Sequence, residues 1–429
     1  MQRRIFALIT EQTIINFITP FDYDIRKSRN GRWIDQKCTP DVLSFIADCI
    51  YDYVTNNPNK EFCTQDIWFS NYAVRNTEAV FKKPNPRQNA AKNEYDKFFQ
   101  QPMKLLANSQ VLIERKDGLK NIYKVNNIEI LEYIALSEKN ALKFLYRYIE
   151  KVLLDSELFY DFQEFFQNQK KYENNKDKMQ AGYIKIKQKF YDFTHSYTLI
   201  KKDLECGRIF TKVINPLAYF YNAYGTEKGK ISSDIITYDM LMYNRNNFRD
   251  IYANKPKGIT RKVYASKHPI EINEKYYDYQ SSRAKRFLRL FNDQYRNGVT
   301  EHLEETQIRD KAIHIHHIFP KVLYPEICSY LENLIALTPT QHFNYAHPNG
   351  KTQEINIEYQ KLLLLSKADR IKDNIENSYE EKEERIYEFP KFLHILSVGF
   401  DNDEVEEIQD MDFASVMNAI NVHYANIAI

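Results

Sequence analysis

The 429-residue chain has few of the residues on which small, loop-rich or secreted proteins depend. It contains only 10 glycines and five cysteines, and the cysteines are scattered with no Cys-x-x-Cys pair. An odd number of scattered cysteines argues against a disulfide framework and against a four-cysteine zinc site. Because hydrophobic residues make up 43% and aromatic residues 14%, the composition favours a mainly helical protein with a sizeable core.

Long apolar runs are also missing. No stretch approaches the ~18 uninterrupted apolar residues that a membrane-spanning helix needs. Residues 1–17 begin with basic residues that are followed by apolar ones, as in a signal peptide. Thr, Glu and Gln interrupt the apolar run, however, and no small-residue cleavage site follows. We therefore expect a cytoplasmic protein with no membrane partner.

The chain has no large excess of charge of either sign. It carries 60 Lys plus Arg against 58 Asp plus Glu, a net charge of +2, which excludes a strong overall attraction to nucleic acid. Acidic residues are concentrated in 380–388 and 401–412, so the preceding segments carry more than their share of positive charge. Any surface that binds DNA must therefore be local.

The N-terminal part predicts three helices. Thr39 and Pro40 fit the cap and first turn of one helix, and Thr64 fits the start of a second. The apolar series in residues 95–106 predicts a third, which Pro102 should kink or restart.

Residues 111–125 predict a hairpin that follows these helices. Two apolar runs flank Asp117 and Gly118, a pair suited to a tight turn with positive φ. Three helices and a two-stranded ribbon resemble a winged helix, a common DNA-binding module. The alternative is a generic helical domain with a stabilising hairpin.

Basic residues interleaved with Tyr and Asn recur in residues 205–232 and 243–262. Cations supply phosphate contacts, while Arg and Asn can read base edges; the alternative is an ordinary solvated face. The candidate DNA-binding residues are Arg208, Lys212, Arg245, Arg249, Lys257, Arg261 and, further along the chain, Lys351.

Five of the ten histidines lie between residues 314 and 347. Histidine binds metals when neutral and takes up a proton near neutral pH. Residues 312–319 and 331–337 predict two short strands, and residues 338–346 predict a helix capped by Thr338. Adjacent strand residues point to opposite sides, so His316 and His317 can flank a bound phosphate.

The spacing of this cluster resembles a known motif. The paired histidines His316 and His317 are followed sixteen residues later by an Asn-Leu pair at Asn333, and nine residues after Asn333 by His342. This spacing is similar to the ββα-metal motif of the His-Asn-His (HNH) nuclease family, with paired histidines as in colicin nucleases. Residues 206–365 more loosely resemble bacterial restriction endonucleases that carry this motif. The resemblance implies that His317 is the general base, that His316 and His342 are metal ligands, and that Asn333 pins the loop and helps to hold the base.

Two further histidines are less clearly assigned. His347 follows His342 by five residues rather than the four of the colicin-like pattern, and on a continuous α-helix it would point elsewhere. Pro348 disfavours helical geometry at position 347, so the helix can end there and let His347 turn inward as a metal ligand; capping and phosphate contact are the alternatives. His314 shares the strand face of His316, and we expect it to support the site. Ordinary core histidines are the alternative for the whole cluster.

We therefore expect a mainly α protein with small β elements (α+β). The resemblance implies a metal-dependent endonuclease that hydrolyses phosphodiester bonds in double-stranded DNA, most simply a sequence-specific type II restriction endonuclease of the bacterial cytoplasm. A modification-dependent (methylated-DNA) restriction nuclease and a non-catalytic DNA-binding protein are the alternatives. One divalent ion per active site is expected, with Mg first and Mn, Ni, Co or Zn also suitable. A homodimer could cut both strands, although nothing in the sequence requires one.

At 429 residues the chain is long enough for several domains. The expected parts are a helical, winged-helix-like DNA-recognition domain in 1–150, a helical central region with basic DNA-facing segments in 151–300, the ββα-metal nuclease core in 301–365, and an acidic helical C-terminal region in 366–429.

Overall fold

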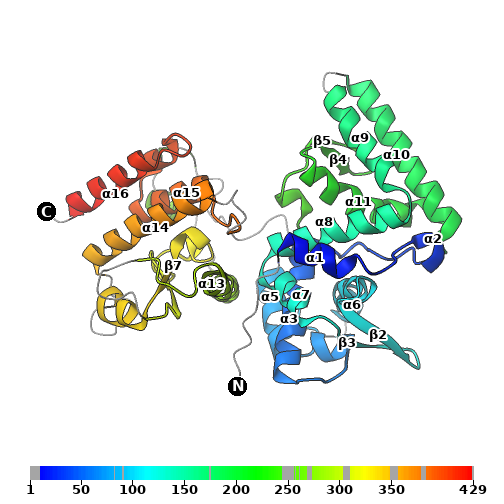
Figure 1. Ribbon diagram of the computed structural model, residues 1–429, viewed down its shortest axis with the longest axis horizontal. Helices are drawn as coiled ribbons and strands as arrows, with labels where there is room; N and C mark the ends of the chain where they lie inside the picture. The colour runs from blue at the N-terminus through cyan, green and yellow to red at the C-terminus, as the bar shows by residue number, and fades with distance from the viewer. Residues whose placement is uncertain are drawn as a thin grey trace. The chain divides into compact units, whose positions relative to one another are not determined.

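The computed structural model describes residues 10–427 apart from 82, 89–90, 173–174, 244–255, 257, 260, 268–272, 303–309, 348–355 and 378–382. The chain forms two compact units, Ile9–Asn246 and Asn247–Ile429, here called the N-terminal and C-terminal units (Figure 1). Both consist mainly of helices with sheets of two or three short strands. The expected fold class is therefore confirmed.

The N-terminal unit contains helices and two small sheets. Its helices are α1 (Glu11–Ile18), α2 (Ile25–Ser28), α3 (Pro40–Asn56), α4 (Thr64–Trp68), α5 (Asn71–Phe81), α6 (Lys92–Asn108), α7 (Ile128–Leu136), α8 (Glu138–Asp155), α9 (Phe159–Lys171), α10 (Lys176–Tyr197), α11 (Asp203–Phe220) and the 3₁₀ turn η2 (Asp239–Leu241). Its strands are β1 (Phe62–Cys63), β2 (Leu112–Asp117), β3 (Lys120–Val125), β4 (Tyr224–Glu227) and β5 (Lys230–Ile235).

The hairpin expected in residues 111–125 is present. Asp117 pairs with Lys120 at its end, and Gly118 has a φ of 57°, the left-handed conformation that a tight turn needs. The short strand β1 pairs with β3 and makes the sheet three-stranded in the order β1-β3-β2. With only two residues, β1 has no alternating pattern by which it could be predicted from the sequence.

Two details of the expected helices differ. Thr39 is the N-cap residue of α3, but its side chain makes no capping hydrogen bond. Helix α6 continues through Pro102 instead of restarting. Pro102 costs one backbone hydrogen bond, whereas Phe98, Phe99 and Leu106 are fully buried on the same helix, and this packing holds both halves of α6 in one element.

The C-terminal unit surrounds one small antiparallel sheet with helices. Its elements are α12 (Arg261–Lys267), α13 (Glu274–Tyr295), β6 (His314–His317), η3 (Pro325–Ile327), η4 (Leu331–Asn333), β7 (Leu334–Leu337), η5 (Gln341–Ala346), α14 (Ile357–Asn377), α15 (Phe389–Phe400), η8 (Asp403–Glu407) and α16 (Phe413–Ile427). Helices α14 and α16 lie side by side (Figure 1).

The four residues of β7 form the centre of this unit's core. Leu334, Ile335, Ala336 and Leu337 are each fully buried, and they belong to one apolar cluster that extends from Leu288 to Tyr424 and includes residues of α13, α14, α15 and α16. The helices around β7 therefore fix the position of its partner strand β6, which carries the histidines.

Contacts group the described chain into these two compact units, and the four segments expected from the sequence stay a prediction. Helix α8 runs across residue 150, and residues on both sides of position 365 share the core of the C-terminal unit. Among the described residues, no helix combines the length and apolar character that crossing a bilayer requires.

Candidate metal centre

The histidines are presented by β6, whose register against β7 is regular. His314 pairs with Leu337, His316 with Ile335 and His317 with Leu334. Because side chains alternate along a strand, His314 and His316 share one face and His317 lies on the other. The two strands and the helical turn after them appear in the expected order, and Thr338 caps that turn by accepting a hydrogen bond from the backbone N of Gln341 at 3.2 Å.

Three imidazoles converge on one point. One ligand nitrogen from each of His316, His342 and His347 lies within 4.8 Å of the others. The ring centroid of His316 lies 5.3 Å from that of His342 and 4.8 Å from that of His347. The ring centroids of His342 and His347 are 4.9 Å apart. His316 and His347 are each only 8% exposed, so the cluster is largely shielded from water.

The position of His347 follows from an unusual helical turn. Element η5, Gln341–Ala346, is a π-helix, and His347 is its C-cap residue. A π-helix is closed by i→i+5 hydrogen bonds, so residues five apart return to the same side. His342 and His347, which an α-helix would direct apart, therefore face the same point. The helix does end before His347, as Pro348 led us to expect.

The donor set fits a divalent metal ion. Metal–nitrogen bonds of about 2.0–2.1 Å place two imidazole nitrogens on one ion roughly 3 to 4 Å apart, so a slight contraction of the cluster brings all three onto one ion. Nδ1 of His342 is buried with no hydrogen-bond partner among the described residues. A buried imidazole nitrogen without a partner is costly, and coordination would satisfy it.

The electrostatic environment keeps these rings neutral. Burial, with a smaller contribution from His347, lowers the pKa of His342 to about 4. Burial is also the main reason why the pKa of His316 lies well below its usual value, with neighbouring histidines adding to the effect. Neutral imidazole is the form that binds metals, so the site does not have to lose protons near neutral pH.

His317 is oriented as a base by two contacts. Its Nε2 lies 3.0 Å from the carbonyl oxygen of Cys328 and 3.0 Å from Oγ of Ser281. A carbonyl oxygen only accepts, so Nε2 carries the proton and Nδ1 keeps the free lone pair. Burial, followed by the charge of Lys285, lowers the pKa of His317 to about 3. The ring is therefore neutral near pH 7 with its lone pair at Nδ1, although a pKa this low also makes it a weak base.

Asn333 supports this arrangement from inside the core. It is 0% exposed, and its Oδ1 accepts from the backbone N of Phe319 at 2.8 Å. Its Nδ2 donates to the carbonyl oxygens of Phe319 at 3.0 Å and Ile327 at 3.3 Å. Asn333 thus joins the chain just after His317 to the loop before β7. Because it is buried, it is a positioning residue and not one that touches substrate.

His314 lies beside the three-histidine cluster and not in it. Its ring stacks on that of His342 at 4.7 Å between centroids, and it meets Phe343 edge-on at 4.9 Å. This contact fixes the ring of His342, which agrees with the supporting role expected for His314.

The basic residues proposed for DNA contact are only partly described. Arg208 is exposed on α11, and Lys212 is half-buried on the same helix. Arg261 is the first residue of α12, and its side chain lies outside the described part. Arg245, Arg249, Lys257 and Lys351 also lie outside the described residues.

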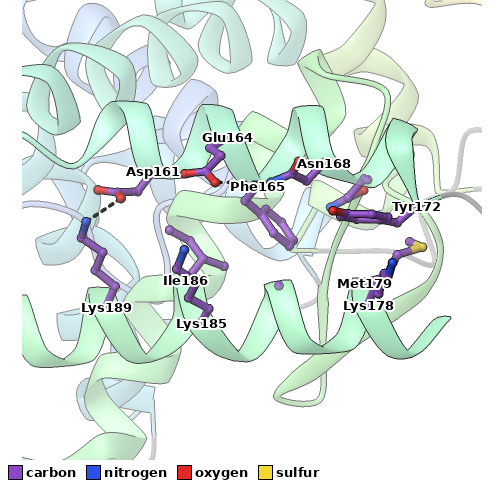
Figure 2. Close-up of a pocket in the computed structure, with 12 residues that line it drawn as sticks. Asp161, Glu164, Phe165, Asn168, Tyr172, Lys178, Met179, Lys185, Ile186 and Lys189 are labelled. Atoms are coloured by element: carbon purple, nitrogen blue, oxygen red, sulfur yellow. Dashed lines mark hydrogen bonds and ion pairs between the residues drawn. The ribbon is translucent and has the colours of Figure 1, made fainter. Parts of the chain in front are cut away.

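Two surface hollows lie in the N-terminal unit, and the residues that line them are distant in sequence from the histidines of residues 314–347. One lies between α9 and α10, where Phe165 points into the gap and Lys189 reaches Asp161 at 2.5 Å (Figure 2). Its volume of about 80 Å³ is far below the ~300–1,000 Å³ of ordinary ligand pockets. The other has a volume of about 450 Å³, and aromatic residues such as Trp33 and Tyr148 line it.

The structure adds two residues that the sequence analysis missed, Ser281 and Lys285 of α13. Ser281 contacts the His317 ring, and Lys285 contributes to the lowered pKa values of His316, His317 and His342. The basic character of residues 281–298 was visible in the sequence, but no local pattern indicated which of its residues faces the histidines.

Comparisons of the chain with models of known protein families, with curated proteins and with solved structures find no match in any of the three. Any functional assignment must therefore rest on the residues and geometry of the site itself.

Proposed function

We propose that this chain is a metal-dependent HNH endonuclease that hydrolyses phosphodiester bonds in double-stranded DNA and acts as a sequence-specific restriction enzyme. The observation that carries the proposal is the convergence of His316, His342 and His347 next to a fourth imidazole, His317, whose Nδ1 is free to accept a proton. A cluster of ordinary core histidines would not combine a three-nitrogen cation site with a separately oriented base.

The chemistry assigned to His317 is general-base catalysis. Nδ1 takes a proton from a water molecule as the water oxygen attacks phosphorus, which typically contributes about 10²- to 10⁴-fold to the rate. The bond from phosphorus to the 3′ oxygen breaks, and that oxygen leaves and is protonated by solvent, so the products carry a 5′ phosphate and a 3′ hydroxyl. A divalent ion, when bound by the three imidazoles, supplies Lewis-acid stabilisation of negative charge.

The donor set also bears on which ion is used. Three imidazoles with no carboxylate in the cluster among the described residues suit Zn, Ni or Co better than Mg, which prefers oxygen ligands. We therefore propose one divalent ion per site, with Zn, Ni or Co ahead of Mg and Mn. Cleavage of phage DNA in parallel with each of these ions, after removal of bound metal, tests this order.

The test of the activity uses His317→Ala and His342→Ala, with His195→Ala as the matched control. His195 lies in α10 of the N-terminal unit and has no part in the proposed site. Purified wild type and the control should cut phage DNA into discrete fragments with a common end sequence, whereas both site variants should not. Equal cutting by wild type and His317→Ala would show that the base is wrongly assigned, and random fragment ends would contradict sequence specificity.

One observation favours the modification-dependent alternative as a second candidate. The hollow of about 450 Å³ in the N-terminal unit has Asn30 and Asn108 in its lining, amide groups that can hydrogen-bond the edge of a base flipped from the duplex, while the lining residues Tyr23, Trp33 and Tyr148 are almost fully buried. Cutting of methylated DNA but not of the same unmodified DNA would select this candidate, and the reverse result would reject it.

A further inference from the structure

Helix α13 lies against the strands that carry the proposed site. It contacts both β6 and β7, and Ser281 on this helix lies 3.0 Å from Nε2 of His317. Residues four apart on an α-helix are neighbours on one face. Lys285, one turn after Ser281, is therefore directed toward the same histidines.

The charge of Lys285 acts on the whole site. It contributes to the lowered pKa values of His316, His317 and His342, which agrees with its place one turn after Ser281, the residue that contacts His317. The side chain is half-buried. Its own pKa is lowered, first by burial and then by Lys321.

Lys285 differs from its basic neighbour in having no acidic partner. Lys321 forms an ion pair with Asp278, whereas Lys285 makes no ion pair or hydrogen bond with any residue that the structure describes. A half-buried cation without a counter-charge is unfavourable. It becomes favourable when an anion is bound, and a DNA phosphate between His317 and the metal cluster is such an anion.

We propose that Lys285, from outside the ββα motif, binds the scissile phosphate and stabilises the negative charge that grows on its oxygens during attack. This inference rests on the proposed nuclease function. It assigns to α13 a direct part in the chemistry, because preorganised cations aimed at developing charge lower the barrier in a water-poor site.

The first test measures binding and needs no metal and no cleavage. The affinity of the full chain for a short DNA duplex is measured in EDTA at several salt concentrations, for wild type, Lys285→Gln and Lys372→Gln. Lys372 is an exposed lysine on α14 of the same unit and controls for net charge. Loss of one phosphate contact should reduce the slope of log K against log salt by about 0.9 in Lys285→Gln, and the control should keep the wild-type slope.

The second test measures single-turnover cleavage with bound metal. Lys285→Gln should cut about 10²- to 10³-fold more slowly while binding the metal at least as tightly as wild type, because a nearby positive charge is removed, and Lys285→Arg, which restores a cation, should recover part of the rate. Unchanged cleavage and an unchanged salt slope in Lys285→Gln would overturn the inference and leave the nuclease proposal standing. A wild-type protein that cuts no DNA would instead overturn the nuclease proposal, on which the role of Lys285 depends.

Discussion

At the scale of single residues, the site depends on side chains that are almost completely removed from water. Asn333 is the clearest case, since each of its polar side-chain atoms is used by the backbone around His317. The spacing of the histidines and Asn333 singled out these residues because it resembles the HNH motif, and the roles that the resemblance implies stay predictions. The contact between Ser281 and His317, 36 residues apart, depends on tertiary packing and could not be predicted.

Asn333→Ala should lower the free energy of unfolding by about 2–4 kcal/mol. The change removes three buried hydrogen bonds, and each buried polar group left without a partner costs about 1–3 kcal/mol, partly offset by relaxation. Urea unfolding measures the loss, with Asn377→Ala as the control because Asn377 is exposed. A loss below about 1 kcal/mol would contradict the positioning role of Asn333.

Glu94 in the N-terminal unit should make the stability of the protein depend on pH. It lies 2.6 Å from Lys83 and 3.3 Å from Lys37, whose side chains are 8% and 11% exposed. The hydrogen bond from Lys83 is the main cause of a pKa of Glu94 below its usual 4.5. Its contribution to stability is therefore complete above pH 4.5 and is lost as the pH falls through the lowered pKa.

Glu94→Gln should accordingly destabilise the protein by about 1–2 kcal/mol at pH 7, a figure reduced for the 41% exposure of Glu94. The difference from wild type, followed by urea unfolding, should shrink as the pH is lowered from 7 toward 3. If the difference in unfolding free energy between the two proteins grew on acidification, the pKa of Glu94 would be raised and not lowered.

At the scale of elements, the π-helical turn η5 decides the composition of the metal centre. The sequence predicted a helix that starts at Thr338 and ends before Pro348, but not its winding, because a wider turn has no local signature of its own. The same holds for α6, where the burial of its apolar face overrides the interruption expected from Pro102. The Asp117-Gly118 hairpin was predictable because its turn requires a positive φ.

The length of this turn can be changed directly. Deletion of Asn344, which is exposed, makes His342 and His347 four residues apart, and an ordinary α-helical turn returns such residues to one face. We expect the deletion variant to bind a divalent ion within about tenfold of wild type. Insertion of one alanine after Asn344 places His342 and His347 six residues apart. This variant should bind the ion much more weakly, because neither an α-helix nor a π-helix brings residues six apart to the same face. Calorimetric titration with Ni²⁺ compares them, and equal affinity in the insertion variant would contradict the role of η5.

At the scale of the whole molecule, the chain consists of two units with separate cores, each continuous in sequence over most of its length. The sequence predicted several domains from length alone but not the boundary near residue 246, which no local composition or spacing pattern marks. The candidate metal centre, its supporting residue Asn333 and Lys285 all belong to the C-terminal unit, whereas the hairpin and the larger hollow belong to the N-terminal unit.

This division predicts that a fragment of residues 247–429 folds and binds a divalent ion without the N-terminal unit. Its apolar core extends from Leu288 to Tyr424, so the described apolar contacts around β6 and β7 lie within the fragment. Circular dichroism during thermal unfolding should show one cooperative transition, which shifts to higher temperature when Ni²⁺ is added. A fragment without a cooperative transition would show that the two units depend on each other.

We propose above that three imidazoles bind one divalent ion next to His317. Crystals grown with Zn²⁺ or Ni²⁺ and measured at the absorption edge of the metal test it most directly. We expect one strong anomalous peak per chain, about 2.0–2.1 Å from a nitrogen of each of His316, His342 and His347. A peak bound elsewhere, or no peak while these rings stay in place, would contradict it.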